Sequence, residues 1–501
     1  MKRYILSIFM LLCISWTYLK AQELEDNILK PVITFNELEN IQLPDVNIDS
    51  VKLIEENNCI IVHGTIGSEI GFEVILPDEW NLRFVMSGGG GFVSTVTNSF
   101  RYLGNQGYVT AGTNTGHEGT WGTADWALNN MERQLNYGHL AIHRTAVVAK
   151  AIMNEYYGKF PLYSYFAGCS RGGGQALIEA QRYPDDFNGI IAGAPVLDFP
   201  GSLARFIINS QLMYPDPSNL EAGVMSRDHL KVLQEFIIDQ CDDKDGVQDN
   251  ILNDPDDCYP DLSLLNNYSG EDEELSLSDM QIDIIRKIYK EVSIEGKVIY
   301  PRYPWGSEQN WWGWVVGPHP DVQRLGFPTS QFAFGTEGAK YLIFNNPDFD
   351  YSKYNFENFK KETEYAGAYL NATSSDYSKF RDKGGKLIIY HGWNDAAFSA
   401  YSTIEHFEAI KHSDSSADDY IKLYLLPGVN HCGGGPGPST TDWLKPIRDW
   451  VEKGVSPEKI IVSKYKDNEL VMSRPVYPYP AKAIYKGTGD PNIESSFMEK
   501  K

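Results

Sequence analysis

Residues 163–172 read YSYFAGCSRG, and this stretch decides the fold. Its first half, Tyr163–Ala167, is an apolar run typical of a short strand, and Gly173–Arg182 is typical of a helix. Between them, residues 168–172 match the G-x-S-x-G pattern, in which glycines permit a sharp turn that exposes a serine hydroxyl at the tip of a sheet. In this strand–turn–helix context the pattern predicts an α/β-hydrolase fold with Ser170 as the nucleophile. The alternative is a glycine turn without chemistry.

The sequence on either side alternates between strand and helix patterns. Short apolar runs predict strands at Cys59–Val62, Phe72–Leu76, Leu82–Met86, Gly189–Ala194, Lys386–Tyr390 and Ile421–Leu426, and apolar residues at helical spacing predict helices at His139–Tyr157 and Thr441–Val451. We expect a further helix between the last two strands. Such alternation is typical of a parallel sheet with helices on both faces.

The alternation stops near Asp198 and returns near Lys386. The residues between are rich in Asp, Asn, Pro and Trp and show no regular βα order. The simplest interpretation is one hydrolase core, residues 22–198 and 372–501, interrupted by an inserted lid domain at 199–371. Two tandem domains are the alternative, which we disfavour because the C-terminal part has too few predicted strands to make its own sheet.

A serine nucleophile needs a general base and an acid that orients the base. In this fold the acid and then the histidine follow the serine, on loops after later strands. Asp395 and His431 each come just after a predicted strand, so Ser170, Asp395 and His431 form the predicted catalytic triad. His391 is a competing base, but it precedes the acid. His117 could line the site, although a plain loop histidine is an equally good interpretation.

An oxyanion hole needs two backbone N–H donors. One belongs to the residue after the nucleophile, Arg171, and the other comes from a glycine-rich loop after an earlier strand. Gly88–Gly91 follows the strand at Leu82–Met86 and is the predicted loop, since only glycine lets the backbone approach a substrate so closely. A glycine turn without substrate contact is the alternative.

Cysteines flank two of the predicted catalytic residues. Cys169 precedes Ser170, and Cys432 follows His431. If the serine and the histidine share a hydrogen bond, their neighbours can fall within disulfide reach, about 5.5 Å between α-carbons. The alternative is two small buried thiols.

A second cysteine pair, Cys241 and Cys258, encloses an acidic loop that reads DDKDGVQDNI over residues 242–251. Clustered carboxylates on a short glycine-containing loop suit Ca²⁺, which takes roughly six to eight oxygen ligands. No glutamate closes the loop at the EF-hand position, and a solvated acidic loop explains these residues equally well.

The composition narrows the classes of partner. Of the 501 residues, 42% are hydrophobic, which supports a sizeable core, and the formal net charge is −23. A surface this acidic repels phosphate backbones and anionic membranes, so we expect no nucleic-acid partner.

The first residues have the pattern of a signal peptide. Lys2 and Arg3 precede a short apolar run at Tyr4–Ile14, and the residues up to Ala21 form an acceptable cleavage site. A membrane anchor is the alternative, but the run is short for a bilayer. We therefore expect residues 1–21 to be removed, a secreted or periplasmic location, and no membrane association of the mature chain. Export permits disulfides, and the five cysteines of the mature chain leave at least one outside a bridge.

These motifs together resemble the tannase and feruloyl esterase family. Its hallmark is a Cys-Ser nucleophile paired with a His-Cys base, which Cys169-Ser170 and His431-Cys432 match. Other blocks similar to the family are Trp80-Asn81, Gly88–Gly91, and residues 189–195, 390–392, 395–399, 427–432 and 485–490, so the resemblance covers nearly the whole mature chain.

The resemblance implies a hydrolase core with a large lid, a Cys169–Cys432 bridge, and a Cys241–Cys258 bridge that clamps a structural calcium loop in the lid. It implies Gly91 and Arg171 as the oxyanion donors. The Ca²⁺ ligands that it implies are the side chains of Asp242, Asp245 and Asp249 and the carbonyls of Val247 and Ile251.

The resemblance also implies an exported carboxylic ester hydrolase for small esters of aromatic acids, derived from plant cell walls or polyphenols. Feruloyl and related hydroxycinnamoyl esters are the expected substrates, and a tannase-type galloyl esterase or a terephthalate-monoester hydrolase are the alternatives. A peptidase could use the same triad. A polyphenol- or carbohydrate-binding protein on an inactive hydrolase scaffold is the non-enzymatic alternative, which the intact triad disfavours.

Some positions depart from the family. Arg171 stands where relatives usually carry a small polar or acidic residue, and Gly174 where many carry arginine. The Arg171 side chain is expected to place a cation near the entrance of the site. Cys59 lacks the N-terminal partner that relatives often have and is expected to be a buried thiol. In the lid, the tryptophans of Trp305–Trp314 could wall a substrate ring, although lid core packing explains most of them better.

Overall fold

The computed structural model describes residues 28–54, 58–270 and 275–501. The predicted signal peptide, residues 1–21, lies outside the described residues. Within the described ranges, no helix has the length and apolar character needed to cross a bilayer.

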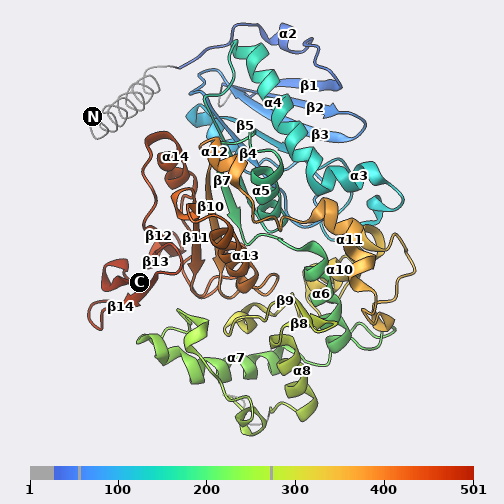
Figure 1. Cartoon of the computed structure of the whole chain (residues 1–501), viewed down its shortest axis with the longest axis vertical. Coiled ribbons are helices and arrows are strands. Elements are labelled where there is room, and N and C mark those ends of the chain that lie inside the picture. Colours follow the sequence, from blue (N-terminus) through green and yellow to red (C-terminus); the bar gives the residue numbers. More distant parts are fainter. Residues whose placement is uncertain (1–27, 55–57, 271–274) are drawn as a thin grey trace.

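A nine-stranded sheet forms the centre of the molecule (Figure 1). Across the sheet the strands are β1 (Val46–Ile54), β2 (Cys59–Ile66), β3 (Ile70–Pro77), β5 (Val109–Thr113), β4 (Arg83–Ser87), β6 (Tyr163–Cys169), β7 (Gly189–Gly193), β10 (Lys386–Gly392) and β11 (Ile421–Leu426). The pairs from β1 to β5 are antiparallel, and those from β5 to β11 are parallel. This mixed, mostly parallel sheet confirms the predicted α/β-hydrolase fold.

Helices cover both faces of the sheet because alternate side chains of a strand point to opposite sides. Phe84 and Met86 of β4 belong to a buried cluster that includes residues of α4 (Ala141–Tyr157), α5 (Arg171–Arg182) and α13 (Ala400–Ser413). Val85, between them, belongs to another cluster with residues of α14 (Leu444–Lys453). The sheet is therefore the middle layer between two apolar cores.

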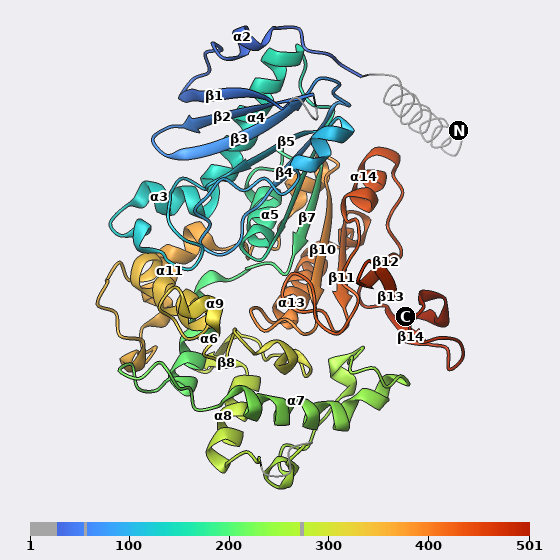
Figure 2. The ribbon, with the colours of Figure 1, turned by 180° about the vertical axis from the view of Figure 1, so that it is seen from behind.

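Most of the chain between β7 and β10 lies at one end of the sheet in both views (Figures 1 and 2). Its elements are α6 (Phe199–Met213), α7 (Arg227–Cys241), α8 (Asp279–Tyr289), β8 (Val292–Ile294), β9 (Lys297–Tyr300), α9 (Pro320–Gln323), α10 (Ser330–Gly338) and α11 (Phe359–Leu370). In its described part none of these joins the nine-stranded sheet, and residues such as Leu233, Phe236 and Ile285 form a separate apolar cluster. We keep residues 199–371 as the proposed extent of the lid.

The predicted strands and helices of the core are all present, but the apolar pattern does not reveal several other elements. These are β1 and β5, the short helices α2 (Phe35–Leu38), α3 (Met131–Leu135) and α12 (Ser378–Asp382), and the C-terminal hairpins β12 (Ile460–Lys466)–β13 (Glu469–Val476) and β14 (Lys482–Tyr485)–β15 (Phe497–Lys500). β5 reads VTAGT, which has too few apolar residues for a strand signal, although all five residues are buried.

Candidate active site

Ser170 occupies the sharp turn between β6 and α5. Its backbone torsions are φ 64° and ψ −123°, a conformation that non-glycine residues rarely adopt. The turn is held because the Ser170 N–H donates to the carbonyl of Gly193 at 2.9 Å and its carbonyl accepts from the N–H of Gly174 at 3.0 Å. A side chain at Gly168 would put its Cβ 2.4 Å from the carbonyl oxygen of Gly172, so the first glycine of the motif is required by close packing. The geometry is that of a nucleophile elbow.

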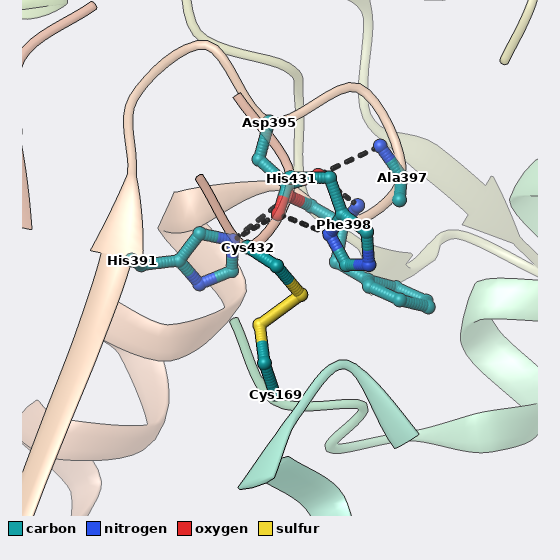
Figure 3. Close-up of a disulfide and its surroundings, with 7 residues drawn as sticks. All are labelled: Cys169, His391, Asp395, Ala397, Phe398, His431 and Cys432. Carbon is teal, nitrogen blue, oxygen red and sulfur yellow. Dashed lines mark hydrogen bonds and ion pairs between the residues drawn. A yellow bond between two sulfur atoms is a disulfide. The ribbon is translucent and has the colours of Figure 1, made fainter. Parts of the chain in front are cut away.

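Asp395 is fully buried and accepts four hydrogen bonds (Figure 3). Its Oδ2 accepts from Nδ1 of His431 at 2.7 Å and from Nε2 of His391 at 3.1 Å. Its Oδ1 accepts from the N–H groups of Ala397 at 2.8 Å and Phe398 at 3.0 Å. Burial opposes the charged form, but the charge interaction with His431 and the hydrogen bonds from both histidines outweigh it. The pKa of Asp395 is therefore held well below its usual value.

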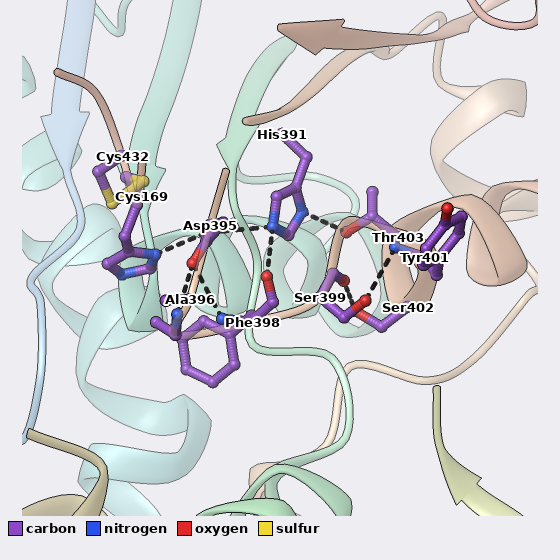
Figure 4. Close-up of polar contacts among 12 residues, drawn as sticks. Cys169, His391, Asp395, Ala396, Phe398, Ser399, Tyr401, Ser402, Thr403 and Cys432 are labelled. Atoms are coloured by element: carbon purple, nitrogen blue, oxygen red, sulfur yellow. Dashed lines mark hydrogen bonds and ion pairs between the residues drawn. A yellow bond between two sulfur atoms is a disulfide. The ribbon is translucent and has the colours of Figure 1, made fainter. Parts of the chain in front are cut away.

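The two histidines on Asp395 have different surroundings, and Figure 4 shows those of His391. The side chain of His391 is 0% exposed, and its Nε2 faces both Asp395 and the carbonyl of Phe398, at 3.0 Å. Because both partners are acceptors, Nε2 carries the proton, and Nδ1 accepts from the hydroxyl of Thr403 at 2.8 Å. The side chain of His431 is 10% exposed. His391 thus supports the carboxylate, a role that chain order alone does not suggest.

A cleft brings the predicted nucleophile and base together. Ser170 and His431 both line it, beside Gly91, Trp312 and Trp314. The ring of Trp314 meets that of His431 edge to face, with the ring centroids 5.0 Å apart. Trp312 and Trp314 therefore wall the site, whereas the neighbouring Trp311 is fully buried in the core of the lid.

Two disulfides are present in the described part of the chain: one joins the two sides of this cleft, and the other closes a loop within the lid. The Cys169–Cys432 bridge has an S–S distance of 2.06 Å and joins α-carbons 5.9 Å apart (Figure 3). The Cys241–Cys258 bridge joins α-carbons 5.3 Å apart. Both bridges that the family resemblance implied are present. Cys59 is buried, and burial raises the pKa of its thiol.

An apolar pocket adjoins the cleft at Ser170. The residues lining it are Gly91, Phe92, Tyr137, Ser170, Arg171, Val196, Phe199, Ser202, Leu203, Phe206, Trp314, Phe334 and Phe398. Lid residues therefore supply much of the wall. The hydroxyl of Tyr137 already donates to the carbonyl of Gly91 at 3.1 Å, and that of Ser202 to the carbonyl of Asp198 at 2.7 Å.

The side chain of Arg171 does not lie at the entrance, which corrects the sequence-based expectation. The residue is 2% exposed. Its Nη1 donates to the carbonyl of Leu370 at 3.1 Å, and its Nη2 donates to the carbonyls of Tyr137 at 3.1 Å and Gly138 at 2.7 Å. Burial lowers the pKa of the guanidinium. A long side chain next to the nucleophile turns inward here because main-chain carbonyls at the core–lid boundary accept its protons.

The two predicted oxyanion donors are backbone amides beside the cleft. The first hydrogen bond of helix α5 is donated by the N–H of Gly174 to the carbonyl of Ser170. Arg171 comes before Gly174 in the chain, so its N–H has no acceptor within the helix. Within the described part of the chain, the amide of Gly91 also has no acceptor. Gly91 has φ +58°, and a Cβ there would lie 2.7 Å from the carbonyl oxygen of Trp121.

The glycine loop is anchored from several sides. Gly89 N–H donates to Oε1 of Gln175 on α5 at 3.1 Å. His117 is buried, stacks on Trp126 at 3.6 Å between ring centroids, and donates from Nε2 to the carbonyl of Phe92 at 2.7 Å. Burial lowers the pKa of His117 to about 4, so the ring is neutral at physiological pH. His117 therefore supports the loop instead of facing a substrate.

The predicted calcium loop shows crowded carboxylates without a formed ligand set. Oδ1 of Asp242 and Oδ1 of Asp249 both accept from the N–H of Ile251, at 3.1 and 3.2 Å. Burial, with a contribution from the charge of Asp249, raises the pKa of Asp245 to about 6. However, Asp249 is paired with Arg474 at 2.5 Å, and no group of three or more His, Cys, Asp or Glu in the described ranges is arranged to hold a metal. Calcium binding by Asp242, Asp245, Val247, Asp249 and Ile251 stays a prediction.

The fold and this site define an α/β-hydrolase. The model of the family "Tannase and feruloyl esterase" matches residues 57–499, and the chain belongs to that family of ester hydrolases. It is 30% identical over 492 residues to mono(2-hydroxyethyl) terephthalate hydrolase of Piscinibacter sakaiensis, covering 86% of this chain and 81% of that protein. It is also 30% identical over 451 residues to feruloyl esterase B of Aspergillus niger, covering 85% of this chain and 83% of that protein.

Solved structures show the same fold. The crystal structure of feruloyl esterase B from Aspergillus oryzae matches with a TM-score of 0.81 at 24% identity, covering 93% of this chain and all of that chain. Tannin acyl hydrolase from Aspergillus niger matches with a TM-score of 0.75 at 18% identity, covering 92% of this chain and 96% of that chain.

Proposed function

We propose that this chain is an exported serine carboxylic ester hydrolase that cleaves small esters of aromatic acids, of the feruloyl or hydroxycinnamoyl type. The observation that carries the proposal is one cleft lined by both Ser170 and His431, with His431 held by buried Asp395 at 2.7 Å. The names of the relatives, a feruloyl esterase and a terephthalate-monoester hydrolase, support aromatic esters as the substrate class.

In the proposed reaction Ser170 attacks the ester carbonyl while Nε2 of His431 takes the hydroxyl proton. Asp395 keeps the proton of His431 on Nδ1 and stabilises the imidazolium that forms. The amides of Gly91 and Arg171 donate to the oxyanion. His431 then protonates the departing alcohol, and a water activated by the same histidine hydrolyses the acyl-enzyme.

The apolar pocket supports a hydroxycinnamoyl acid over a more polar one. Phe199, Phe334 and Phe398 supply its walls, and the hydroxyls of Tyr137 and Ser202 already donate to main-chain carbonyls. A galloyl ring carries three hydroxyls and a terephthalate monoester carries a carboxylate, and burying either without hydrogen-bond partners is costly. Export rests on the signal-peptide pattern of residues 1–21.

The test compares Ser170→Ala with wild type on methyl ferulate, methyl gallate, a terephthalate monoester and a peptide amide. We expect the highest wild-type kcat/KM on methyl ferulate and a loss of several powers of ten in the variant, with unchanged circular dichroism. Turnover by Ser170→Ala within tenfold of wild type would overturn the serine mechanism. A preference for gallate or terephthalate would replace the substrate assignment and leave the mechanism intact.

A further inference from the structure

Tyr137 lies between the two predicted oxyanion donors and contacts both residues. The residue is 2% exposed. On one side, its hydroxyl donates to the carbonyl oxygen of Gly91 at 3.1 Å. On the other, its carbonyl accepts from Nη2 of Arg171 at 3.1 Å, and the guanidinium carbon lies 4.7 Å from the centroid of its ring. A single residue thus links two segments that are 80 residues apart in the sequence and meet only in the folded protein.

The position of Tyr137 is itself tightly constrained. It lies in a π-helical turn, Asn136–Leu140, directly before α4, and such turns occur frequently at functional sites. A Cβ on the next residue, Gly138, would lie 2.7 Å from the carbonyl oxygen of Tyr369, so the turn packs closely against the end of α11. The guanidinium of Arg171 donates hydrogen bonds to the carbonyl of Gly138 in the same turn and to the carbonyl of Leu370 at the end of α11.

Donor spacing matters because an oxyanion hole acts through distance. Its N–H groups stabilise the transition state when they lie about 2.7–3.1 Å from the position of the oxyanion. The amide of Arg171 is set by the start of α5, whereas Gly91 belongs to a loop with φ +58°. Contacts from outside the loop keep its amide in register with the helix: Gln175 of α5 holds Gly89, and Tyr137 holds Gly91 itself.

We infer that Tyr137 is a positioning residue that sets the spacing of the oxyanion donors, through its hydroxyl on Gly91 and its carbonyl and ring on Arg171. The inference rests on the proposed function of Ser170. Burial raises the pKa of Tyr137 to about 12, so its hydroxyl keeps its proton and remains a donor under all ordinary assay conditions. The tyrosine acts through the backbone of Gly91 and does not itself take part in the reaction.

The test is Tyr137→Phe, which keeps the ring and the carbonyl and removes only the hydroxyl. We expect kcat on methyl ferulate to fall about tenfold with KM within twofold of wild type, because complete loss of a donor costs about a hundredfold or more and here the donor is only loosened. Tyr157→Phe is the matched control, since its hydroxyl also donates to a main-chain carbonyl, that of Pro77 at 2.5 Å, in the core. The control should lose thermal stability without losing kcat.

A second readout separates positioning from general loosening. A trifluoromethyl ketone analogue of the substrate forms a tetrahedral adduct with a reactive serine, so its affinity for Tyr137→Phe should fall by the same factor as kcat/KM. The affinity for ferulate, a product without an oxyanion, should stay within twofold. Arg171→Lys replaces the guanidinium that contacts Tyr137 with a shorter side chain and should lower kcat in the same way. This second variant tests the inference if Tyr137→Phe does not fold.

Three results would overturn the inference: kcat of the folded variants within twofold of wild type, an equal loss in Tyr157→Phe, or a loss expressed in KM alone. These failures are distinct from failure of the proposed function. If Ser170→Ala is inactive but Tyr137→Phe is normal, the serine mechanism stands and the positioning role falls. If Ser170→Ala remains active, both fall.

Discussion

Removing the Cys169–Cys432 bridge should reduce turnover more than it reduces the folded fraction. The bridge ties the residue before Ser170 to the residue after His431, across a sequence separation of 263 residues. No hydrogen bond joins Ser170 directly to His431 among the described residues, so the disulfide is the covalent link that keeps the two loops together. The change we consider is the double variant Cys169→Ala with Cys432→Ala.

The stability effect follows from the length of the closed loop. For a separation of 263 residues, the chain-entropy relation gives about 5.6 kcal/mol at 25 °C, which native strain commonly reduces to about 2–4 kcal/mol. The rate effect follows from geometry. His431 precedes a run of glycines, Gly433–Gly435, all with positive φ, and the hydrogen bond to Asp395 fixes only one edge of its ring. A displacement of about 1 Å costs on the order of a hundredfold in rate.

The assay measures kcat on methyl ferulate at a temperature where circular dichroism shows the double variant to be fully folded. We expect kcat to be about a hundredfold below wild type. The matched control is Cys241→Ala with Cys258→Ala, which removes a bridge in the lid, whose loop spans a separation of 17 residues, and should lower thermal stability with kcat near wild type.

Three outcomes would refute this reasoning. The first is a folded double variant with kcat within threefold of wild type. The second is an equal loss of kcat in the lid control, which would show that turnover responds to general destabilisation. The third comes from peptide mapping: alkylation of both Cys169 and Cys432 in active, non-reduced enzyme would show that the bridge is not needed.

Three further predictions concern the carboxylate support, the acidic loop and a buried acid. His391→Phe removes a hydrogen bond to charged Asp395, worth about 1.5–3 kcal/mol, and should lower kcat by roughly tenfold or more with the fold intact. Thr403→Val removes a contact to His391 instead of to Asp395, so it should lower kcat less. Equal kcat in both variants and wild type would contradict this. A chelator should lower Tm and leave kcat unchanged well below Tm, because an ion bound only to the folded state stabilises that state. Asp245→Asn should abolish this effect of the chelator on Tm. Purified protein that contains no calcium, and whose Tm does not change with the chelator, would exclude the ion. Burial raises the pKa of Glu308, in the lid, from its ordinary value of 4.5 to about 7, so the folded state binds more protons than the unfolded state in that window and stability falls as pH rises through it. The Tm of Glu308→Gln relative to wild type should therefore increase from about pH 4.5 to 7 and then level off, and a pH-independent difference measured by calorimetry would show that Glu308 does not titrate there.

Local sequence patterns are enough to predict the core of this fold and to propose Ser170, Asp395 and His431 as the triad. Strand–turn–helix order around Ser170 depends on neighbouring residues, and the glycine at 168 is needed for a close contact with the backbone of Gly172, within the motif itself. The order of acid and base along the chain follows from the order of the parallel strands. The Cys-Ser and His-Cys pairs are likewise adjacent in sequence, so the bridge between them could be inferred from the family resemblance before the structure.

Other features depend on contacts between distant segments, and only the tertiary structure decides them. His391 and His431 both form hydrogen bonds to Asp395. Their different burial and the contact of His431 with Trp314 distinguish the supporting histidine from the proposed base. The inward turn of Arg171 requires carbonyl acceptors 33 and 199 residues away, at Gly138 and Leu370. No periodicity or motif in the sequence encodes these hydrogen bonds between distant residues. A buried polar group must be hydrogen-bonded, and here the fold, not the neighbouring chain, supplies the hydrogen-bond partner.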